Sequence, residues 1–323
     1  MWLQMRMYLL IGVLFGLLFA LILAIGSALG GTSVIVYVIL AGGMVLLQYL
    51  LSPYLVGLMM KVKYVSEKEE PELHKMVAEL AREAGIPKPK IGIAQISVPN
   101  AFAFGRTRHD ARICVTEGIR KLLSKDEMRA VLGHEISHIK HRDMAIITAL
   151  SLVPMVCYYI AMSIMWSGMF GGRRRDSTGY LVLIGVGAFV LYFITNLLVL
   201  YGSRIREYYA DEGSVKIGNK PHFLASALYR LAYANARTSK EEVRKTEGLK
   251  AFFINDPSQA KNEITELKQI DRDMSGTIDA NELAAVRNSK MHLGTADKMM
   301  EILSTHPNML KRIQRLATLQ TSL

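Results

Sequence analysis

Four long apolar runs dominate the pattern of hydrophobic and polar positions along the chain. They cover residues Tyr8–Gly30, Val34–Met60, Ala145–Phe170 and Tyr180–Tyr201. Each run reaches the roughly 20 residues that a helix needs to cross the hydrocarbon core of a bilayer. The first run is too long for the apolar core of a cleaved signal peptide, and a second run follows it at once. The pattern therefore predicts a polytopic membrane protein with about four apolar helices.

The last two runs are more polar than the first two, since they contain Ser151, Pro154, Ser163 and Asn196. They are expected to form a hairpin that either crosses the bilayer or dips into it and returns. The loop between them carries three arginines, 173–175, which would lie outside if the hairpin crosses, against the usual excess of positive charge on cytoplasmic loops. Both arrangements return the chain to the same side of the membrane.

Shorter patterns between the second and third runs predict a small soluble domain. An apolar stripe from Leu73 to Ala84 follows Pro71, which suits a first helical position, and Gly85 ends the stripe. Beyond this helix, strands are predicted over Lys90–Ile96, Asn100–Phe104 and Ala111–Thr116. The expected fold class is α+β and mainly helical, with a small β-sheet in the soluble domain.

The alternation of apolar and polar stretches divides the chain into four parts. They are two transmembrane helices (1–60), a cytoplasmic segment with the sheet and a motif helix (61–144), a hydrophobic hairpin (145–202) and a C-terminal helical part of the soluble domain (203–323). Arg6 precedes the first span, and Lys61 and Lys63 follow the second. This distribution favours a cytoplasmic location for the soluble domain.

Composition and charge narrow the class of protein further. Hydrophobic residues make up 51% of the chain, which is high for a soluble protein, and the formal net charge is +11. In a chain with four apolar runs this charge favours contact with anionic lipid headgroups, and no nucleic-acid-binding motif is present. Cys114 lies in a predicted strand and Cys157 in an apolar run, so a disulfide between them is not expected. This indicates a reducing side for the soluble domain.

The sequence His134-Glu135-Ile136-Ser137-His138 is the strongest chemical motif in the chain. A capping box of Ser124 and Glu127 predicts a helix here, on which the two histidines project from one face and can hold one zinc ion. Glu135 can then take a proton from the attacking water and return it to the leaving amine. The alternative is a chance occurrence of the motif on an ordinary helix.

The hairpin topology brings a third ligand to the two histidines. Residues just after Ser203 return to the membrane face from which the third run departs, close to the end of the motif helix. There Glu207 can supply the third zinc ligand, and Asp211, one turn on, can accept the ring N–H of a ligating histidine. His141 lies about one turn beyond the pair and would overshoot the metal.

The strand Asn100–Phe104 is the candidate substrate-binding edge of the sheet. Metallopeptidases commonly bind a peptide by adding it as an extra strand beside the metal, and this strand comes shortly before the motif helix. Strands that serve only the core are the alternative interpretation.

Several motifs in one order resemble the HtpX family of integral-membrane zinc metallopeptidases, distant relatives of the CAAX prenyl protease. They are H-E-I-S-H at 134–138, E-Y-Y-A-D at 207–211, the segment Val98–Gly105, and Ser304–Pro307 with Arg312. The resemblance covers most of the chain. It implies cleavage of misfolded or damaged membrane proteins at the cytoplasmic face, as part of membrane protein quality control.

The resemblance also implies roles for single residues. It makes His134, His138 and Glu207 the ligands of one zinc ion and Glu135 the general base. It places Asn100 in the substrate-binding strand, together with its neighbours Ala101 and Phe102. His306 becomes a candidate to stabilise the oxyanion, which suits a hydrogen-bond donor near the metal. An ordinary helix N-terminus at Thr305-His306-Pro307 is the alternative.

Residues 271–282, D-R-D-M-S-G-T-I-D-A-N-E, depart from the family pattern. They fit the twelve-residue calcium loop of an EF-hand, with Gly276 at the sixth position and the apolar Ile278 at the eighth. Met274 replaces the small residue common at position four, and the chain has no second such loop. The alternative is a polar linker whose acidic residues face water. The predicted calcium ligands are Asp271, Asp273, Ser275, the Thr277 carbonyl, Asp279 and Glu282.

The sequence thus predicts a zinc endopeptidase of the cell membrane, tuned by calcium, that acts on membrane or unfolded proteins. The oligomeric state is not predicted. The alternative is a catalytically silent membrane adaptor or chaperone that keeps zinc as a structural element. A structural zinc site usually fills its fourth position from the protein, whereas two histidines and one glutamate leave that position open for water. This difference favours the enzyme.

Overall fold

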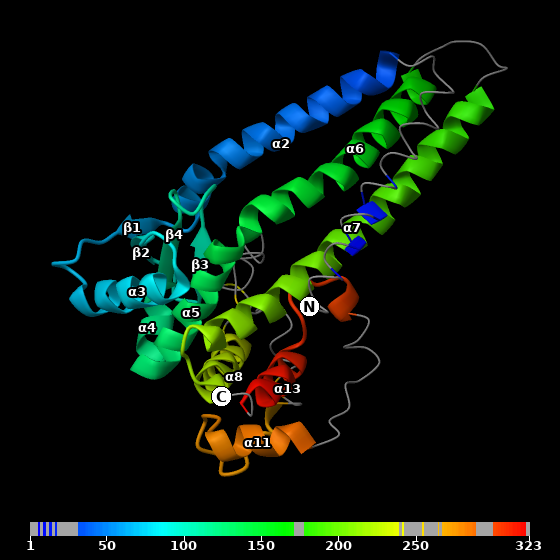
Figure 1. Ribbon diagram of the computed structural model, residues 1–323. Coiled ribbons are helices and arrows are strands. Elements are labelled where there is room, and N and C mark those ends of the chain that lie inside the picture. Colours follow the sequence, from blue (N-terminus) through cyan, green and yellow to red (C-terminus); the bar gives the residue numbers. More distant parts are fainter. Residues whose placement is uncertain are drawn as a thin grey trace. The chain divides into compact units, whose positions relative to one another are not determined.

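The computed structural model describes residues 32–170, 178–238, 267–288 and 300–320, and a few single positions elsewhere, among them Leu10, Leu14 and Ile254. The chain divides into two compact units. One contains Met1–Leu51 and Ala145–Ser203, and the other contains Ser52–Met144 and Arg204–Leu323. The first is called the apolar unit below and the second the catalytic unit (Figure 1).

Long helices make up the described part of the apolar unit. They are the larger part of α2 (Thr32–Met59), nearly all of α6 (Asp143–Phe170) and the first part of α7 (Thr178–Lys216). Side chains of α6 such as Val153, Val156 and Ile160 are buried in one cluster with Ala188 and Val199 of α7. Helices α6 and α7 therefore pack against each other as the predicted hairpin requires.

Two stretches of the described chain are long and apolar enough to cross a membrane. They are Asp143–Met165 and Val182–Lys216. The first predicted span, Tyr8–Gly30, lies largely outside the described residues, and so does the arginine loop at 173–175. Membrane crossing by these two regions and by α2 stays a prediction.

Helix α7 differs from the expected arrangement of an apolar run followed by a separate helix over residues 204–217. It is a single helix of 39 residues. The reason is local: no proline interrupts the junction, and Gly202 alone costs a helix only about 1 kcal/mol relative to alanine. The apolar run and the residues Glu207 and Asp211 consequently lie on one continuous helix.

A mixed four-stranded sheet begins the catalytic unit, with strand order β1-β2-β4-β3. The strands are β1 (Val62–Tyr64), β2 (Lys90–Ala94), β3 (Ala101–Phe104) and β4 (Arg112–Thr116). β2 and β4 are parallel, while β3 runs antiparallel to β4. β3 is therefore an edge strand. The short β1, which pairs antiparallel with β2, was not predicted.

The helices of the catalytic unit begin and end where the sequence places their caps. α3 (Pro71–Ala84) stops at Gly85, whose φ of 69° is in the left-handed region that glycine adopts without strain. α5 (Lys125–His141) begins with the predicted capping box of Ser124 and Glu127. The remaining described helices are α4 (Glu117–Leu122), α8 (Pro221–Arg237), α11 (Ala280–Asn288) and α13 (Met309–Leu319).

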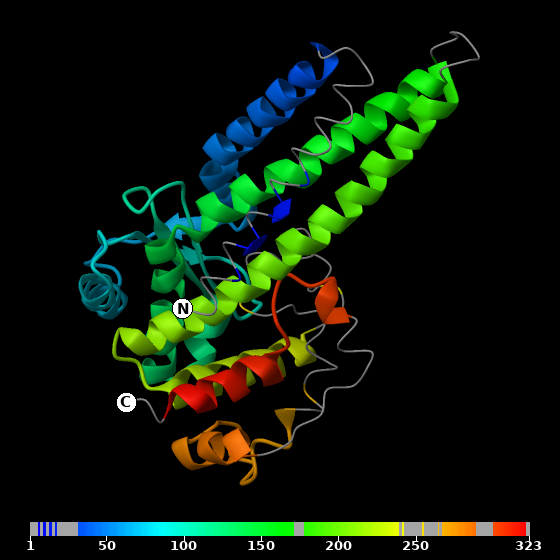
Figure 2. The same cartoon turned by 45° about the vertical axis from the view of Figure 1, so that its right-hand side comes forward.

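The core of the catalytic unit lies between α5, α8 and α13. α8 packs against both α5 and α13, and α11 packs on α13 (Figure 2). Buried residues such as Leu132, Leu228 and Ile313 belong to one hydrophobic cluster. This packing fixes the motif helix α5 and carries the C-terminal helix α13 to the site described next.

Candidate active site

The motif histidines lie on the buried face of α5. His134 is 1% exposed and Glu135 4% exposed. The helix ends at Arg142, which adopts a left-handed conformation, so that α6 begins directly afterwards at Asp143. The last turn of α5 is thereby presented toward the polar end of α7.

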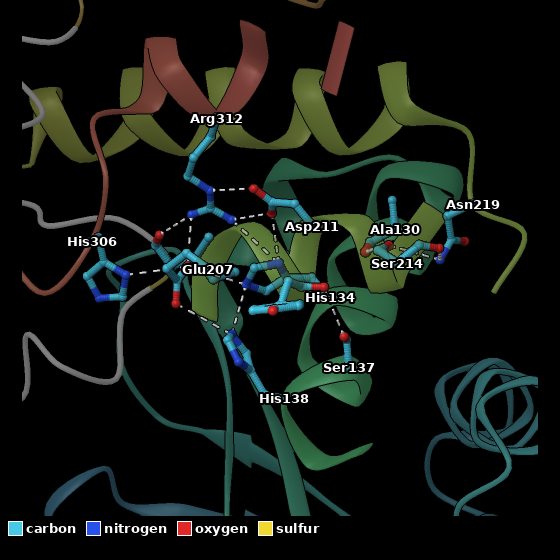
Figure 3. Close-up of polar contacts among 12 residues, drawn as sticks. Ala130, His134, Ser137, His138, Glu207, Asp211, Ser214, Asn219, His306 and Arg312 are labelled. Atoms are coloured by element: carbon cyan, nitrogen blue, oxygen red, sulfur yellow. Dashed lines mark hydrogen bonds and ion pairs between the residues drawn. The ribbon is translucent and has the colours of Figure 1, made fainter. Parts of the chain in front are cut away.

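Three side chains from α5 and α7 converge (Figure 3). The Nε2 atoms of His134 and His138 are 3.1 Å apart. Glu207 Oε2 lies 3.6 Å from His134 Nε2, and Glu207 Oε1 lies 3.5 Å from His138 Nε2. The three residues predicted as metal ligands are thus brought together, although Glu207 on α7 follows the two histidines of α5 by about 70 residues in the sequence.

This donor set fits a zinc ion. Zinc bonds of about 2.0–2.1 Å in tetrahedral geometry place neighbouring ligand atoms about 3.3 Å apart. The spacings of 3.1 to 3.6 Å among the three side chains are close to that value. Glu207 Oε2 is buried and accepts no hydrogen bond from the described part of the chain, although Arg312 Nη1 lies 3.2 Å away, so the oxygen can still accept a metal ion.

Two carboxylates hold the outer nitrogens of the histidines. Asp211 Oδ1 lies 2.9 Å from His134 Nδ1, at the place predicted for it. Asp143 Oδ2 lies 2.6 Å from His138 Nδ1, and its other oxygen pairs with Arg206. Such contacts fix the ring orientation and leave Nε2 free to bind metal. Sequence reasoning missed Asp143, although its position just after the motif helix was a usable signal.

Arg312 of α13 completes the charge balance of the site. It is fully buried and donates to both oxygens of Asp211, at 2.7 and 3.0 Å, and to the Ile254 carbonyl at 2.8 Å. Its Nη1 lies 3.2 Å from Glu207 Oε2. The two acids outweigh the effect of burial and raise the pKa of the guanidinium further. Sequence reasoning gave Arg312 no role. Its position among the apolar residues of α13 was a usable signal, because an arginine there needs a buried acidic partner.

The pKa of Glu135 is raised to about 7. Burial is the main cause, the charge of His134 opposes it, and the nearby Glu207 carboxylate adds to it. A hydrogen bond from the Ala103 backbone also acts on this carboxyl, which places Glu135 next to β3. A carboxyl that titrates near neutrality can both accept and return a proton.

The two histidines respond differently to the same surroundings. Burial would lower the pKa of His134, but its bonds to Asp211 and Glu207 outweigh burial and raise the pKa to about 9. Burial and the charge of His134 lower the pKa of His138. The two imidazoles therefore differ in basicity, because the Asp211 and Glu207 carboxylates stabilise the charged form of His134 while the charge of His134 disfavours that of His138.

His306 lies at the edge of the same site. Its Nδ1 is 3.5 Å from Glu207 Oε2, and both ring nitrogens are buried without a hydrogen bond to the described residues. His141, excluded above as a ligand, instead lies with its Nδ1 3.2 Å from Ser137 Oγ and its ring against Tyr209.

The predicted substrate residues are buried through their side chains. Asn100 Oδ1 accepts a hydrogen bond from the Ile254 backbone at 3.0 Å, and Phe102 packs with Met60 and Phe104 in a small cluster. Ala101 is 1% exposed. These side chains therefore belong to the packed interior, and substrate binding along this strand, which would use the backbone of β3, stays a prediction.

The acidic segment 271–282 forms a loop that continues into the first turn of α11 (Ala280–Asn288). Asp271, Asp273 and Glu282 each offer an oxygen within 4.8 Å of the others, an arrangement that could hold a cation. Gly276 has a φ of 80°, which suits the sharp turn expected at the sixth position. Ser275 and Gly276 donate backbone hydrogen bonds to Asp271.

Comparisons with known proteins agree with this geometry. Residues 67–320 match the model of peptidase family M48. The chain is 56% identical over 229 residues to the "Protease HtpX homolog" of Methanothermobacter thermautotrophicus, covering 71% of this chain and 85% of that protein. It is 35% identical over 290 residues to the "Protease HtpX homolog 2" of Methanosarcina mazei, covering 90% of this chain and 86% of that one.

A solved structure with a similar fold is that of Ste24p from S. mikatae. The TM-score is 0.53 at 18% sequence identity, and the match covers 97% of this chain but 65% of the longer Ste24p chain. At this identity the likeness concerns the fold. The mostly helical architecture with a small mixed sheet agrees with it.

Proposed function

The chain belongs to peptidase family M48, and from this premise we propose that it is a zinc-dependent membrane endopeptidase that cleaves misfolded or damaged membrane proteins at the cytoplasmic face. The observation that carries the proposal is the convergence of His134, His138 and Glu207 beside the buried carboxyl of Glu135. The helices Asp143–Met165 and Val182–Lys216 support the membrane location.

The residues divide the chemistry among them. Zinc, held by the two histidines and Glu207, would polarise the substrate carbonyl and the attacking water. Glu135 accepts the proton of that water and delivers it to the leaving amine, for which a pKa of about 7 is suited. Asp211 and Asp143 keep the imidazoles oriented, and Arg312 balances the charge of Asp211.

Edge strand β3 is the proposed place for the substrate backbone. It pairs with β4 on one side, and Ala103 in the strand bonds Glu135. A peptide added to β3 by backbone hydrogen bonds would therefore present a carbonyl close to the general base. His306, whose ring nitrogens make no hydrogen bond to the described residues, would then donate a ring N–H to the oxyanion.

The test is cleavage of unfolded casein by the purified protein, with and without a chelator. Glu135→Gln should abolish cleavage but keep the zinc content and unfolding temperature of the wild type, because it removes only the proton carrier. Glu67→Gln, a change at an exposed glutamate, is the matched control. Equal cleavage by Glu135→Gln and wild type would reject the general base. Absence of chelator-sensitive cleavage in the wild type would favour the adaptor alternative.

We also propose that calcium binds residues 271–282 and tunes the protease. The cluster of Asp271, Asp273 and Glu282 supports binding, since calcium prefers carboxylate oxygens. A hydrogen-bonded path supports tuning. The Ile278 backbone donates to Ser226 Oγ at 3.1 Å, and Ser226 donates to Glu127 Oε1 at 2.6 Å. Glu127 belongs to the capping box of α5, the helix with the zinc motif.

Calorimetric titration with calcium tests this second proposal. The wild type should bind with an affinity on the order of micromolar to millimolar, and Glu282→Gln should not bind, because position twelve normally supplies two oxygens. Asp126→Asn, outside the loop, should bind as the wild type does. Absence of calcium heat, or equal heats in wild type and Glu282→Gln, would reject the site. Binding with an unchanged cleavage rate would reject tuning.

A further inference from the structure

Three apolar side chains are exposed close together in the catalytic unit, on the helical turn before His306. Met300, Ile302 and Leu303 are 39%, 50% and 65% exposed. Outside α2, α6, α7 and the single described positions Leu9 and Val13, the other exposed large hydrophobic residues of the described chain are Tyr64 and Met274, which stand singly. A cluster of this kind marks a surface that contacts a partner or a lipid phase.

The opposite side of this turn is polar and tied to the protein. Glu301 pairs with Lys311 of α13, and Ser304 is 6% exposed. The segment therefore separates an exposed apolar side from a fixed polar side, the division found in segments that lie in a membrane interface.

Arg204 places this segment at a defined level along α7. Its Nη1 donates to the carbonyls of Ile302, at 3.0 Å, and Ser304, at 2.7 Å. Arg204 directly follows the apolar stretch of α7 from Val182 to Ser203. At 1.5 Å per residue that stretch spans about 33 Å, close to the roughly 30 Å of a hydrocarbon core. A span of this length ends near Ser203, so Arg204 lies at the headgroups and holds residues 300–304 there.

We propose that residues 300–303 form an interfacial anchor, in which Met300, Ile302 and Leu303 insert into the lipid surface beside the membrane exit of α7. The inference rests on the membrane location proposed above. Anionic lipid suits it, because Arg204 lies at the same level and the chain carries a net charge of +11.

The anchor has a consequence for the choice of substrate. His306 follows three residues after Leu303, and its Nδ1 lies 3.5 Å from Glu207 Oε2. An anchor at the membrane surface therefore keeps the edge of the active site beside that surface. Segments of membrane proteins that leave the bilayer are then the substrates nearest to the site.

Fluorescence quenching by spin-labelled lipids tests the anchor in the full chain. A fluorophore is attached to Leu303→Cys, Met274→Cys or Phe193→Cys in vesicles of equal parts phosphatidylcholine and phosphatidylglycerol. The native Cys114 and Cys157 are buried and do not compete for the label. Met274 is an exposed apolar residue of the loop 271–282, and Phe193 is exposed on the apolar stretch of α7.

The anchor predicts that a headgroup spin label quenches Leu303→Cys several-fold more strongly than Met274→Cys. A label deep in the acyl chains should quench Phe193→Cys. If Phe193→Cys is quenched but Leu303→Cys matches Met274→Cys, the anchor is overturned while the membrane location stands. If Phe193→Cys is not quenched by either label, the membrane location fails and the anchor with it. A Leu303→Cys fluorophore shielded from water but insensitive to both lipids would identify a protein partner instead, and would also overturn the anchor.

Cleavage assays add a readout that depends on the position of the substrate. Leu303→Glu should lower the cleavage of a bilayer-embedded substrate relative to casein several-fold, because a charge resists insertion. Leu303→Phe, which preserves an apolar side chain at the same exposed position, should restore the wild-type ratio. An unchanged ratio in Leu303→Glu would contradict a role in substrate choice.

Discussion

Two carboxylates from different helices share the task of orienting the motif histidines. Asp211 lies in α7 and Asp143 at the first residue of α6, yet each contacts an Nδ1 atom on α5. Both acids are in turn paired with buried arginines, Asp211 with Arg312 and Asp143 with Arg206. Buried charges are tolerated when each is paired in this way. Each of the two orienting carboxylates therefore has a buried cationic partner.

Removing either orienting carboxylate should weaken zinc binding. Asp143→Ala and Asp211→Ala are each expected to lower zinc affinity about 10–100-fold, because the imidazoles lose their fixed orientation. Glu207→Ala should lose zinc entirely at nanomolar free metal. Competition with a chromogenic chelator measures all three, with the exposed Asp126→Ala on α5 as the control. Zinc affinity in Asp143→Ala equal to that of the control would show that its contact with His138 is incidental.

Arg312 is expected to matter more for folding than any exposed arginine. Arg312→Leu would leave the charge of Asp211 buried without its partner, and breaking such a pair costs about 3–5 kcal/mol. Chemical denaturation of the metal-free protein measures the loss. Arg315→Ala on the same helix removes a partly exposed cation 3.6 Å from Glu212 and should cost about 1 kcal/mol or less. Similar losses in the two variants would contradict a special role for Arg312.

The ligands His134, His138 and Glu207 could be predicted from sequence, whereas the contact of Arg312 with Asp211 could not. Helical spacing joins the two histidines, and the return of the apolar hairpin joins Glu207 to them. No spacing rule connects Asp211 to Arg312 across about 100 residues, because their contact depends on how α13 packs on α8. The same limit applies to Asn100, whose hydrogen bond from the Ile254 backbone joins residues that are far apart in the sequence.

At the scale of elements, small residues allow α5 and α7 to approach closely. A Cβ atom built on Gly213 of α7 would lie 1.9 Å from Ser137 Oγ, the serine inside the zinc motif. One built on Gly133 would lie 2.2 Å from the Asn219 amide. Ser214 also donates to the Ala130 carbonyl of α5 at 2.7 Å (Figure 3). Small residues at these contacts therefore set the distance between α5 and α7, the two helices that carry His134, His138 and Glu207.

Gly213→Ala should therefore disturb both stability and metal binding. The added methyl group forces α5 and α7 apart, and overpacking of this kind costs about 1–3 kcal/mol. Gly187→Ala is a matched control on the same helix, because a Cβ there meets nothing within 4 Å. It should leave stability equal or slightly higher, since alanine favours helix. Thermal unfolding with and without zinc compares the two, and equal behaviour would contradict the close approach.

Element boundaries were largely predictable where the chain carries explicit signals. The capping box at Ser124 and the left-handed Gly85 fix helix ends through local chemistry, which a sequence displays. The strand β1 was missed because three residues carry too little pattern and depend on β2 for their hydrogen bonds. The continuity of α7 was missed because its composition changes from apolar to polar near residue 203. Such a change resembles the end of a helix in the sequence, although the same helix continues.

Across the whole molecule, the two units differ in how much apolar surface they expose. The apolar unit exposes residues such as Leu183, Val186 and Phe193, which a lipid phase would cover. The catalytic unit instead has its main hydrophobic cluster in its interior, around α5, α8 and α13. The +11 charge is compatible with a soluble unit beside anionic headgroups.

The membrane topology of the hairpin is a prediction that can be tested directly. At 1.5 Å per residue α6 is about 42 Å long, more than the roughly 30 Å hydrocarbon core, so we expect the hairpin of α6 and α7 to cross completely. A cysteine in place of Arg174, in the loop outside the described residues, should react with a membrane-impermeant maleimide in intact cells. A cysteine in place of the exposed Lys61, which follows α2, should react only after permeabilisation.

Reaction of both only after permeabilisation would show a hairpin that dips into the bilayer and returns, with the three arginines kept on the cytoplasmic side. The ligand geometry of His134, His138 and Glu207 would be unaffected, because all three residues belong to the catalytic unit.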